Sequence, residues 1–107
     1  MHLPLPIQRY FDADDRNDCE ALLMAFAPDA VVTDEGRTHT GRQAIEAWWR
    51  DAKARAQHRN EPIAAVETGD TTEVRARVSG QFPGSPVTLT FAFLLKGGRI
   101  AGLEIRA

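Results

Sequence analysis

The sequence predicts an α+β domain in which helices pack against a curved antiparallel sheet, with an apolar pocket between the two layers. Apolar residues recur at helical spacing through much of the first 58 residues. From Ile63 onward the period changes to two, which is typical of half-buried strands. The 107 residues suit a single domain, 1–107, and we find no repeat, linker or low-complexity segment.

Two helices are expected first, the longer one over residues 6–17. Tyr10 and Phe11 lie on its apolar face, and the aspartates around them occupy the polar side. Asn17 is a candidate N-cap for a second, short helix, with Glu20 three residues on as in a capping box. The chain therefore opens with a helical pair.

Two short strands should follow this pair. Pro28 is expected to end the second helix. Residues 30–34 contain Val31 and Val32, both strong strand formers. After a turn at Gly36, residues 37–39 can pair with them as a second strand.

A third helix has the clearest local signal. Thr40 and Gln43 fit a Thr-x-x-Gln capping box, and the helix is expected to run to about His58. Its apolar positions recur at helical spacing: Ala44, Ile45, Trp48, Trp49 and Ala52.

The last part of the chain predicts a four-stranded meander. Strands are expected at 63–68, 72–80, 87–96 and 99–106. Gly69-Asp70 and Gly97-Gly98 suit tight hairpin turns, and connections this short make neighbouring strands antiparallel. One face of the third strand carries Thr88, Thr90, Ala92 and Leu94. Such a half-apolar face suits pairing with a second subunit, so we expect a homodimer through the open sheet face.

Composition argues against several classes of function. The 13 basic and 15 acidic residues give a net charge of −2, and the basic residues form no concentrated patch, so no nucleic-acid partner is expected. No apolar run is long enough to span a membrane, and the N-terminus lacks the features of a signal peptide, so the expected location is the cytoplasm. Cys19 is the single cysteine, and the three histidines lack metal-ligand spacing. We therefore expect neither a metal nor another cofactor.

Two segments carry a resemblance to a known family. Residues 26–34 read FAPDAVVTD and residues 41–48 read GRQAIEAW, in an element order of helices, short strand, long helix and meander. The chain resembles the nuclear transport factor 2-like superfamily, and within it the SnoaL-like branch. The resemblance implies a cone-shaped, cystatin-like α+β barrel, usually dimeric, with a pocket between the long helix and the sheet. Members include ketosteroid isomerases, polyketide cyclases, dehydratases, epoxide hydrolases and non-catalytic binding domains, so the family does not select a reaction.

The resemblance also implies roles for three residues. Asp34 stands where isomerase relatives carry the catalytic base, and Tyr10 matches their oxyanion-hole tyrosine. The alternatives are a solvated Asp34 that caps the Glu35-Gly36 turn and a half-buried Tyr10 whose hydroxyl reaches solvent or a backbone carbonyl. Phe91 stands where these relatives place a second, protonated acid. Because Phe cannot donate a hydrogen bond, steroid-isomerase activity itself becomes doubtful.

Further candidates come from position in the chain. His39 follows Asp34 by five residues and would form a proton-shuttling pair with it if both turned inward; the alternative is a histidine on an edge strand facing water. His58, at a helix end, is most simply a partner for the helix dipole. Trp48 is in phase with the apolar face and is the expected pocket tryptophan; the alternative is that both tryptophans are core residues. The other expected pocket residues are Phe91, Phe11, Val74 and Leu89.

Three hypotheses follow. The first is an isomerase- or cyclase-like enzyme that transfers protons on a small apolar carbonyl compound, with Asp34 as base, Tyr10 as oxyanion donor and His39 as helper. The second is a non-catalytic binder of a small apolar molecule, which Phe91 favours. The third is a dimerisation module built on the open sheet face.

Overall fold

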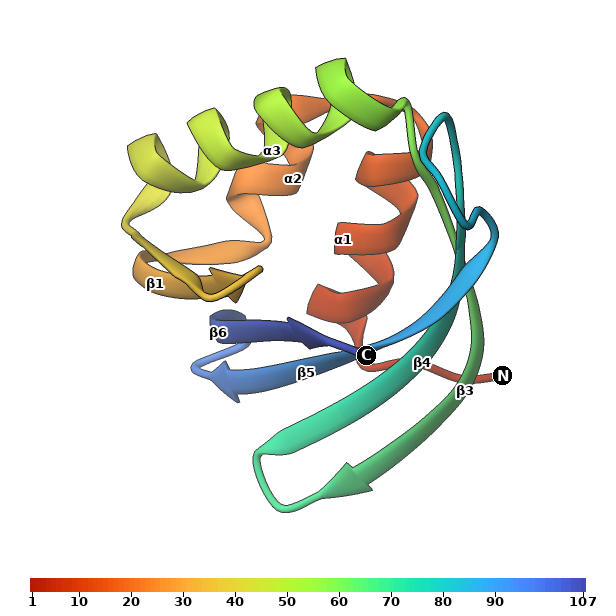
Figure 1. Ribbon diagram of the computed structural model, residues 1–107. Helices are drawn as coiled ribbons and strands as arrows, with labels where there is room; N and C mark the ends of the chain where they lie inside the picture. The colour runs from red at the N-terminus through yellow and green to blue at the C-terminus, as the bar shows by residue number, and fades with distance from the viewer.

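The computed structural model describes residues 1–107 as one strongly curved sheet that wraps around three helices (Figure 1). The helices are α1 (Leu5–Asp15), α2 (Cys19–Met24) and α3 (Arg42–Ala56). The strands are β1 (Phe26–Asp34), β2 (Arg37–Thr40), β3 (Arg59–Thr68), β4 (Thr71–Ser79), β5 (Val87–Lys96) and β6 (Arg99–Arg106). This architecture confirms the predicted α+β fold class.

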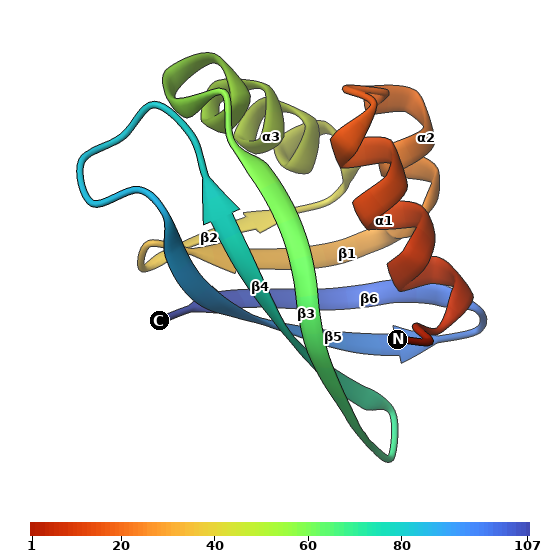
Figure 2. The same cartoon turned by 90° about the vertical axis from the view of Figure 1, so that its right-hand side faces the viewer.

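The sheet has the strand order β2-β1-β6-β5-β4-β3. Strands β3 to β6 form the predicted antiparallel meander. The sheet then continues through β1, which lies parallel to β6, with Val32 opposite Leu103. Figure 2 shows how β3 and β4 bend away from β5 and β6, which gives the sheet its concave side. The helices lie on that side.

An aromatic cluster fills the space between α1 and the sheet. Tyr10 and Phe11 on α1 meet Phe91 and Phe93 of β5 with ring centroids 5.4–5.7 Å apart, and Phe26 of β1 contacts Tyr10 at 5.8 Å. These pairs are edge-to-face, the arrangement that aromatic rings prefer. The predicted period of two in β5 is confirmed, because Phe91 and Phe93 are both buried.

The helix starts differ from the sequence predictions. Asp18, rather than Asn17, caps α2, because its carboxylate accepts a hydrogen bond from the Ala21 amide at 3.1 Å. Asn17 instead adopts a positive φ of 55° in the turn before it. The Thr40 capping box is also absent, since Thr40 stays paired with Val31 in the sheet. Residue 41, a glycine with φ 86°, is the N-cap of α3.

Three element boundaries also differ from the sequence predictions. Helix α2 ends at Met24, and Pro28 lies inside β1 rather than at a helix end. Helix α3 ends at Ala56 because Gln57 takes a left-handed conformation with φ 47°. Strand β3 therefore begins at Arg59, four residues earlier than expected, and His58 lies in the connection between α3 and β3.

None of the three helices is long and apolar enough to cross a membrane.

Candidate functional site

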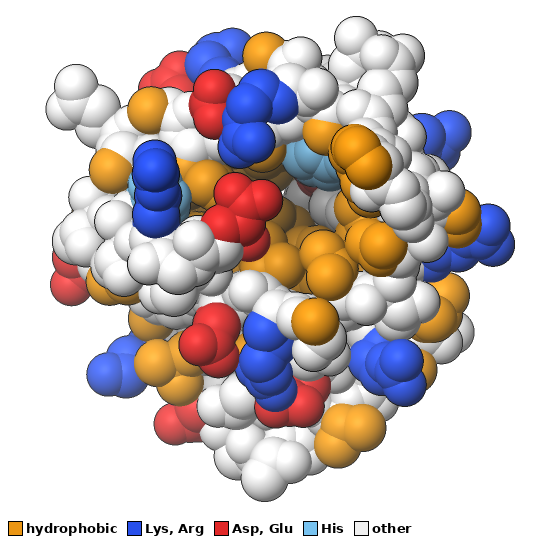
Figure 3. Space-filling view, viewed as in Figure 1, with side chains coloured by type: hydrophobic (Ala, Val, Ile, Leu, Met, Phe, Trp, Pro, Cys, Tyr) orange, Lys and Arg blue, Asp and Glu red, His pale blue; other side chains and the backbone are white.

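A cavity of about 320 Å³ lies between α3 and the concave side of the sheet, with the inner face of α1 at its end. Ten of its fifteen lining residues are hydrophobic. Figure 3 shows this hollow, with hydrophobic side chains inside it and acidic and basic side chains around its edge. Ligand sites in proteins usually hold about 300–1,000 Å³, so this cavity suits a small molecule.

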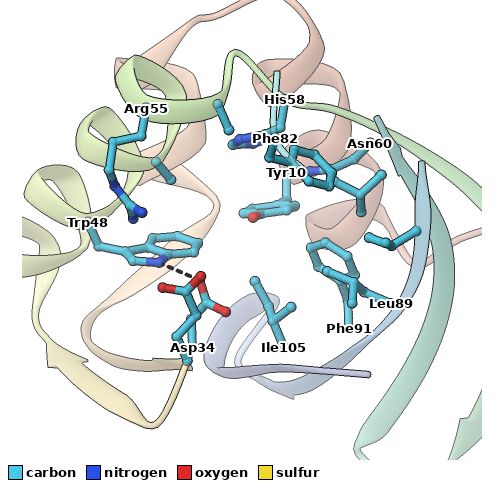
Figure 4. Close-up of a pocket in the computed structure, with 15 residues that line it drawn as sticks. Tyr10, Asp34, Trp48, Arg55, His58, Asn60, Phe82, Leu89, Phe91 and Ile105 are labelled. Atoms are coloured by element: carbon cyan, nitrogen blue, oxygen red, sulfur yellow. Dashed lines mark hydrogen bonds between the residues drawn. The ribbon is translucent and has the colours of Figure 1, made fainter. Parts of the chain in front are cut away.

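Tyr10 and Asp34 open into this one cavity from different elements. Tyr10 comes from α1 and Asp34 from the end of β1, and Figure 4 shows both side chains directed into the hollow. The Tyr10 side chain is only 1% exposed, and its hydroxyl makes no hydrogen bond to another cavity residue. It is therefore available to a ligand.

The environment of Tyr10 keeps its phenol protonated. Burial raises the pKa of Tyr10 well above its ordinary value, and the negative charges of Asp14 and Asp34 raise it further. The hydroxyl is therefore a hydrogen-bond donor throughout the physiological pH range.

Asp34 is held by Trp48. The Trp48 Nε1–H donates a hydrogen bond to Asp34 Oδ2 at 3.0 Å, the one hydrogen bond drawn between cavity residues in Figure 4. Only one carboxylate oxygen is engaged, which leaves Oδ1 free to accept a proton or a ligand hydrogen bond. Trp48 lines the cavity, whereas the adjacent Trp49 is buried outside it.

The other predicted pocket residues divide into two groups. Leu89 and Phe91 line the cavity, Phe91 on the wall formed by β5 (Figure 4). Phe11 and Val74 do not line it and belong to the core. Phe11 follows Tyr10 directly on α1, so its side chain points about 100° away and packs in the core against Phe91 and Phe93.

His39 does not join Asp34 as the sequence suggested. It lies on the edge strand β2 opposite Val32, outside the cavity lining. Its ring centroid lies 6.2 Å from that of Trp48, and no hydrogen bond connects it to Asp34. The side-chain partner of Asp34 is instead the indole of Trp48.

Sequence reasoning missed a buried polar cluster behind the cavity, centred on Asp14, which is 1% exposed. Its Oδ1 accepts a hydrogen bond from Trp49 Nε1 at 2.9 Å and lies 3.2 Å from His58 Nε2 and 3.3 Å from Lys53 Nζ. Its Oδ2 accepts a hydrogen bond from Asn60 Nδ2 at 3.0 Å. His58 and Asn60 also line the cavity (Figure 4), so the cluster forms part of its wall.

These contacts outweigh the effect of burial on Asp14. Burial alone would raise the pKa of its carboxyl, but the His58 contact, the Trp49 hydrogen bond and the Lys53 charge lower the pKa below its ordinary value. The prediction that the aspartates of α1 occupy its polar side is therefore wrong for Asp14, which follows Tyr10 by four residues, shares the inner face of the helix and is buried.

Comparison with known proteins identifies the family. Residues 7–103 match the sequence profile of the SnoaL-like domain. The chain belongs to this family. No curated protein matches the chain significantly.

Solved structures agree with this SnoaL-like assignment. A proposed polyketide cyclase from Sinorhizobium meliloti, protein SMa1630, is 56% identical, with a TM-score of 0.96 over 97% of this chain and 95% of that one. A protein with a ketosteroid isomerase-like fold from Catenulispora acidiphila, crystallised with trimethylamine, is 22% identical, with a TM-score of 0.86 over 99% and 87%. A cystatin-fold protein from Novosphingobium aromaticivorans is 18% identical, with a TM-score of 0.82 over 100% and 99%. The expected nuclear transport factor 2-like, cystatin-like fold is confirmed.

Within this SnoaL-like domain, no group of three His, Cys, Asp or Glu side chains is arranged to hold a metal ion. The polar groups that line its cavity are the carboxylates of Asp34 and Glu35, the guanidinium of Arg55, the protonated phenol of Tyr10, the imidazole of His58 and the amide of Asn60, within mostly hydrophobic walls.

Proposed function

We propose that the protein binds a small, largely apolar carbonyl compound in this cavity and transfers a proton on it, as an isomerase- or cyclase-type enzyme. The observation that carries the proposal is that Asp34 and the unpartnered Tyr10 hydroxyl open into one mostly hydrophobic cavity. Membership of the SnoaL-like family and the 56% identity to a proposed polyketide cyclase support this class of reaction.

In this proposal Asp34 is the general base. Its free Oδ1 accepts a proton from the carbon next to the ligand carbonyl, while Trp48 holds Oδ2 and fixes the direction of the carboxylate. Tyr10 donates a hydrogen bond to the carbonyl oxygen as negative charge develops there. Because the raised pKa of Tyr10 keeps its phenol protonated, Tyr10 can donate this hydrogen bond at any physiological pH.

Phe91 limits the ligands that fit this chemistry. It supplies an apolar ring to the cavity wall and cannot donate a second hydrogen bond to the oxyanion. A single phenol stabilises an enolate less than two donors do. We therefore expect the reaction to favour carbonyl compounds whose enolates are already delocalised over an aromatic ring.

Phe91 also favours a second candidate function, the binding of a small apolar molecule without chemistry. The mostly hydrophobic lining would be sufficient for that role. The two functions differ in one measurable respect, because only the first requires Asp34 to exchange a proton with the ligand.

The test uses 2-tetralone, a flat bicyclic ketone, as the probe. In D₂O, replacement of its protons next to the carbonyl by deuterium is followed by proton NMR, with and without the protein. We expect the protein to accelerate this replacement and Asp34→Asn to reduce the acceleration about 10²- to 10⁴-fold. Glu35→Gln is the matched control, since Glu35 is the neighbouring carboxylate of the cavity lining.

Two results would count against catalysis. Binding of 2-tetralone, seen as a change in tryptophan fluorescence, without faster deuterium exchange would favour the non-catalytic binder. Equal losses in Asp34→Asn and Glu35→Gln would remove the special role of Asp34.

We further propose that two copies associate through the outer face of the sheet. Leu94 of β5 and Val66 of β3 are 37% and 66% exposed there, and Thr88 and Thr90 lie between charged residues on the same face. The proposed setting is the cytoplasm, in which the free thiol of Cys19 would stay reduced.

A further inference from the structure

We propose that His58, oriented by Asp14, is a second proton-exchanging group of the cavity and acts from the side away from Asp34. The inference rests on the proposed function and extends it to a residue for which the family resemblance implied no role. Figure 4 shows His58 and Asp34 at separate ends of the cavity, with Tyr10 between them. A ligand in this space would meet the Asp34 carboxylate at one end and the His58 imidazole at the other.

The partners of Asp14 fix which nitrogen of His58 carries a proton. Trp49 Nε1, Lys53 Nζ and Asn60 Nδ2 are all donors, so the Asp14 carboxylate serves only as an acceptor. His58 Nε2, 3.2 Å from Asp14 Oδ1, must then be a donor as well. The proton therefore stays on Nε2, and Nδ1 is the nitrogen at which a second proton would be held or released.

Nδ1 is also the nitrogen without a protein partner. The one side-chain hydrogen bond of His58 uses Nε2, and no fully buried side-chain nitrogen or oxygen lacks a partner. Nδ1 is therefore reachable by solvent or by a ligand.

Lys53 keeps the charge of Asp14 compensated when His58 loses its proton. Its ammonium lies 3.3 Å from Asp14 Oδ1 and donates to the His58 carbonyl oxygen at 2.7 Å, so the buried carboxylate is already balanced when the imidazole is neutral. The charged groups around His58 are thus Asp14 of α1 and Lys53 of α3, with the Asp15–Arg59 ion pair on the outer side. Arg55 of α3, which is paired with Asp51, lines the same cavity.

His58 also connects the cavity with the outside of the molecule. It lines the cavity and, in addition, a surface recess that it shares with Asp15, Lys53 and Arg59. The imidazole therefore lies between the ligand space and bulk water. A proton taken up or released during turnover can be exchanged there without passing the bound ligand.

The proton count balances in the combined mechanism. Asp34 takes a proton from a ligand C–H bond, so the carboxylate becomes a neutral acid and the ligand an enolate held by Tyr10. Imidazolium His58 gives its Nδ1 proton to another carbon or oxygen of the ligand and becomes neutral. The ligand has lost one proton and gained one, and exchange with water returns Asp34 and His58 to their starting states.

The test compares His58→Gln with His39→Gln in the 2-tetralone exchange assay. Glutamine at position 58 can still donate to Asp14 but cannot titrate, and His39 is the matched control because it lies outside the cavity lining. We expect His58→Gln to slow deuterium exchange about 10²-fold and to remove one limb of its pH profile. The 2-tetralone affinity, followed by tryptophan fluorescence, should stay the same.

Nitrogen-15 NMR of the imidazole tests the geometry without any reaction. The His58 signal is assigned by its absence in His58→Gln, and the neutral ring is expected to carry its proton on Nε2. A neutral ring protonated on Nδ1 overturns the inference. So does a His58→Gln variant with the wild-type rate and pH profile, and that result leaves the proposed function intact. A wild-type protein that does not exchange 2-tetralone overturns the proposed function and the inference with it.

Discussion

The indole of Trp48 donates a hydrogen bond to the carboxylate of Asp34 at 3.0 Å, across 14 positions of the sequence. This contact joins α3 to the end of β1 and sets the direction in which the carboxylate faces the cavity. It also replaces the Asp34–His39 pair that the sequence suggested. The candidate base is therefore oriented by a group that cannot itself titrate.

Trp48→Phe should weaken catalysis more than folding. The substitution keeps an aromatic ring in the cavity wall and removes only the donor to Asp34. A hydrogen bond to a charged group contributes about 1.5–3 kcal/mol, and partial exposure to water reduces this figure here, so we expect a loss in stability of about 1 kcal/mol. Urea denaturation measures that loss, and 2-tetralone exchange should fall about tenfold as the carboxylate loses its fixed orientation. An unchanged exchange rate would show that the indole does not position the base.

Tyr10→Phe separates chemistry from stability. The Tyr10 hydroxyl lacks a protein partner, so its removal should change the free energy of unfolding by less than about 0.5 kcal/mol. Loss of the only proposed oxyanion donor should reduce 2-tetralone exchange about 10²- to 10³-fold. A marked loss of stability with normal exchange would instead indicate a packing role.

The lowered pKa of Asp14 predicts how the free energy of unfolding depends on pH. Its folded-state pKa is lowered, because the contacts from His58, Trp49 and Lys53 outweigh burial. The ionised Asp14 carboxylate therefore stabilises the folded state fully at pH values above about 3.9, the pKa of Asp in the unfolded chain. This stabilisation is lost as the pH falls through the lower pKa that Asp14 has in the folded state. Breaking a buried ion pair costs about 3–5 kcal/mol, so Asp14→Asn should be strongly destabilised at pH 7.

Urea denaturation of wild type and Asp14→Asn at pH 7 and below pH 4 checks this prediction. The difference in unfolding free energy between the two proteins should shrink toward the lower pH. Asp12→Asn is the control, since Asp12 lies on the exposed side of the same helix, and its difference should be small at both values. A constant difference for Asp14→Asn would contradict the assignment of a lowered pKa.

Gly80 should not tolerate a side chain. A Cβ at this position would lie 2.6 Å from the Ala56 carbonyl oxygen and 3.0 Å from the Cα of His58, both backbone atoms. Gly80→Ala should therefore displace the connection that carries His58 and destabilise the fold by about 1–3 kcal/mol. Thermal unfolding measures this effect, and Gly102→Ala is the control, since the nearest atom to its Cβ position, Leu94 Cβ, lies at an ordinary contact distance of 3.6 Å.

The proposed dimer predicts a contrast between two exposed hydrophobic residues. Leu94→Lys places a charge on the outer sheet face and should shift the protein toward a monomer in light scattering at micromolar concentration. Met24→Lys is the control, because Met24 is 56% exposed on α2, away from the sheet. Wild-type protein that scatters as a monomer would remove the proposed interface.

The candidate site was only partly visible in the sequence. Tyr10 and Asp34 could be identified as candidates because the family resemblance marks their positions, and their opening into one cavity agrees with that expectation. The Asp14 cluster could not be found in this way. Its hydrogen bonds join Asp14 to Trp49, His58 and Asn60, which are 35, 44 and 46 positions away, and no local pattern encodes such distances.

The sequence by itself determined the elements and their buried faces, because the alternation in residues 72–96 and the helical spacing around Trp48 are local consequences of backbone geometry. It also determined the family, through the order of those elements and two short segments. Only the tertiary structure decided that β1 joins the meander parallel to β6, and that Trp48 and Trp49 hold different carboxylates. The physical reason is that a buried polar group is paired with whatever the fold brings within about 3 Å, and that neighbour is set by the packing of the whole chain.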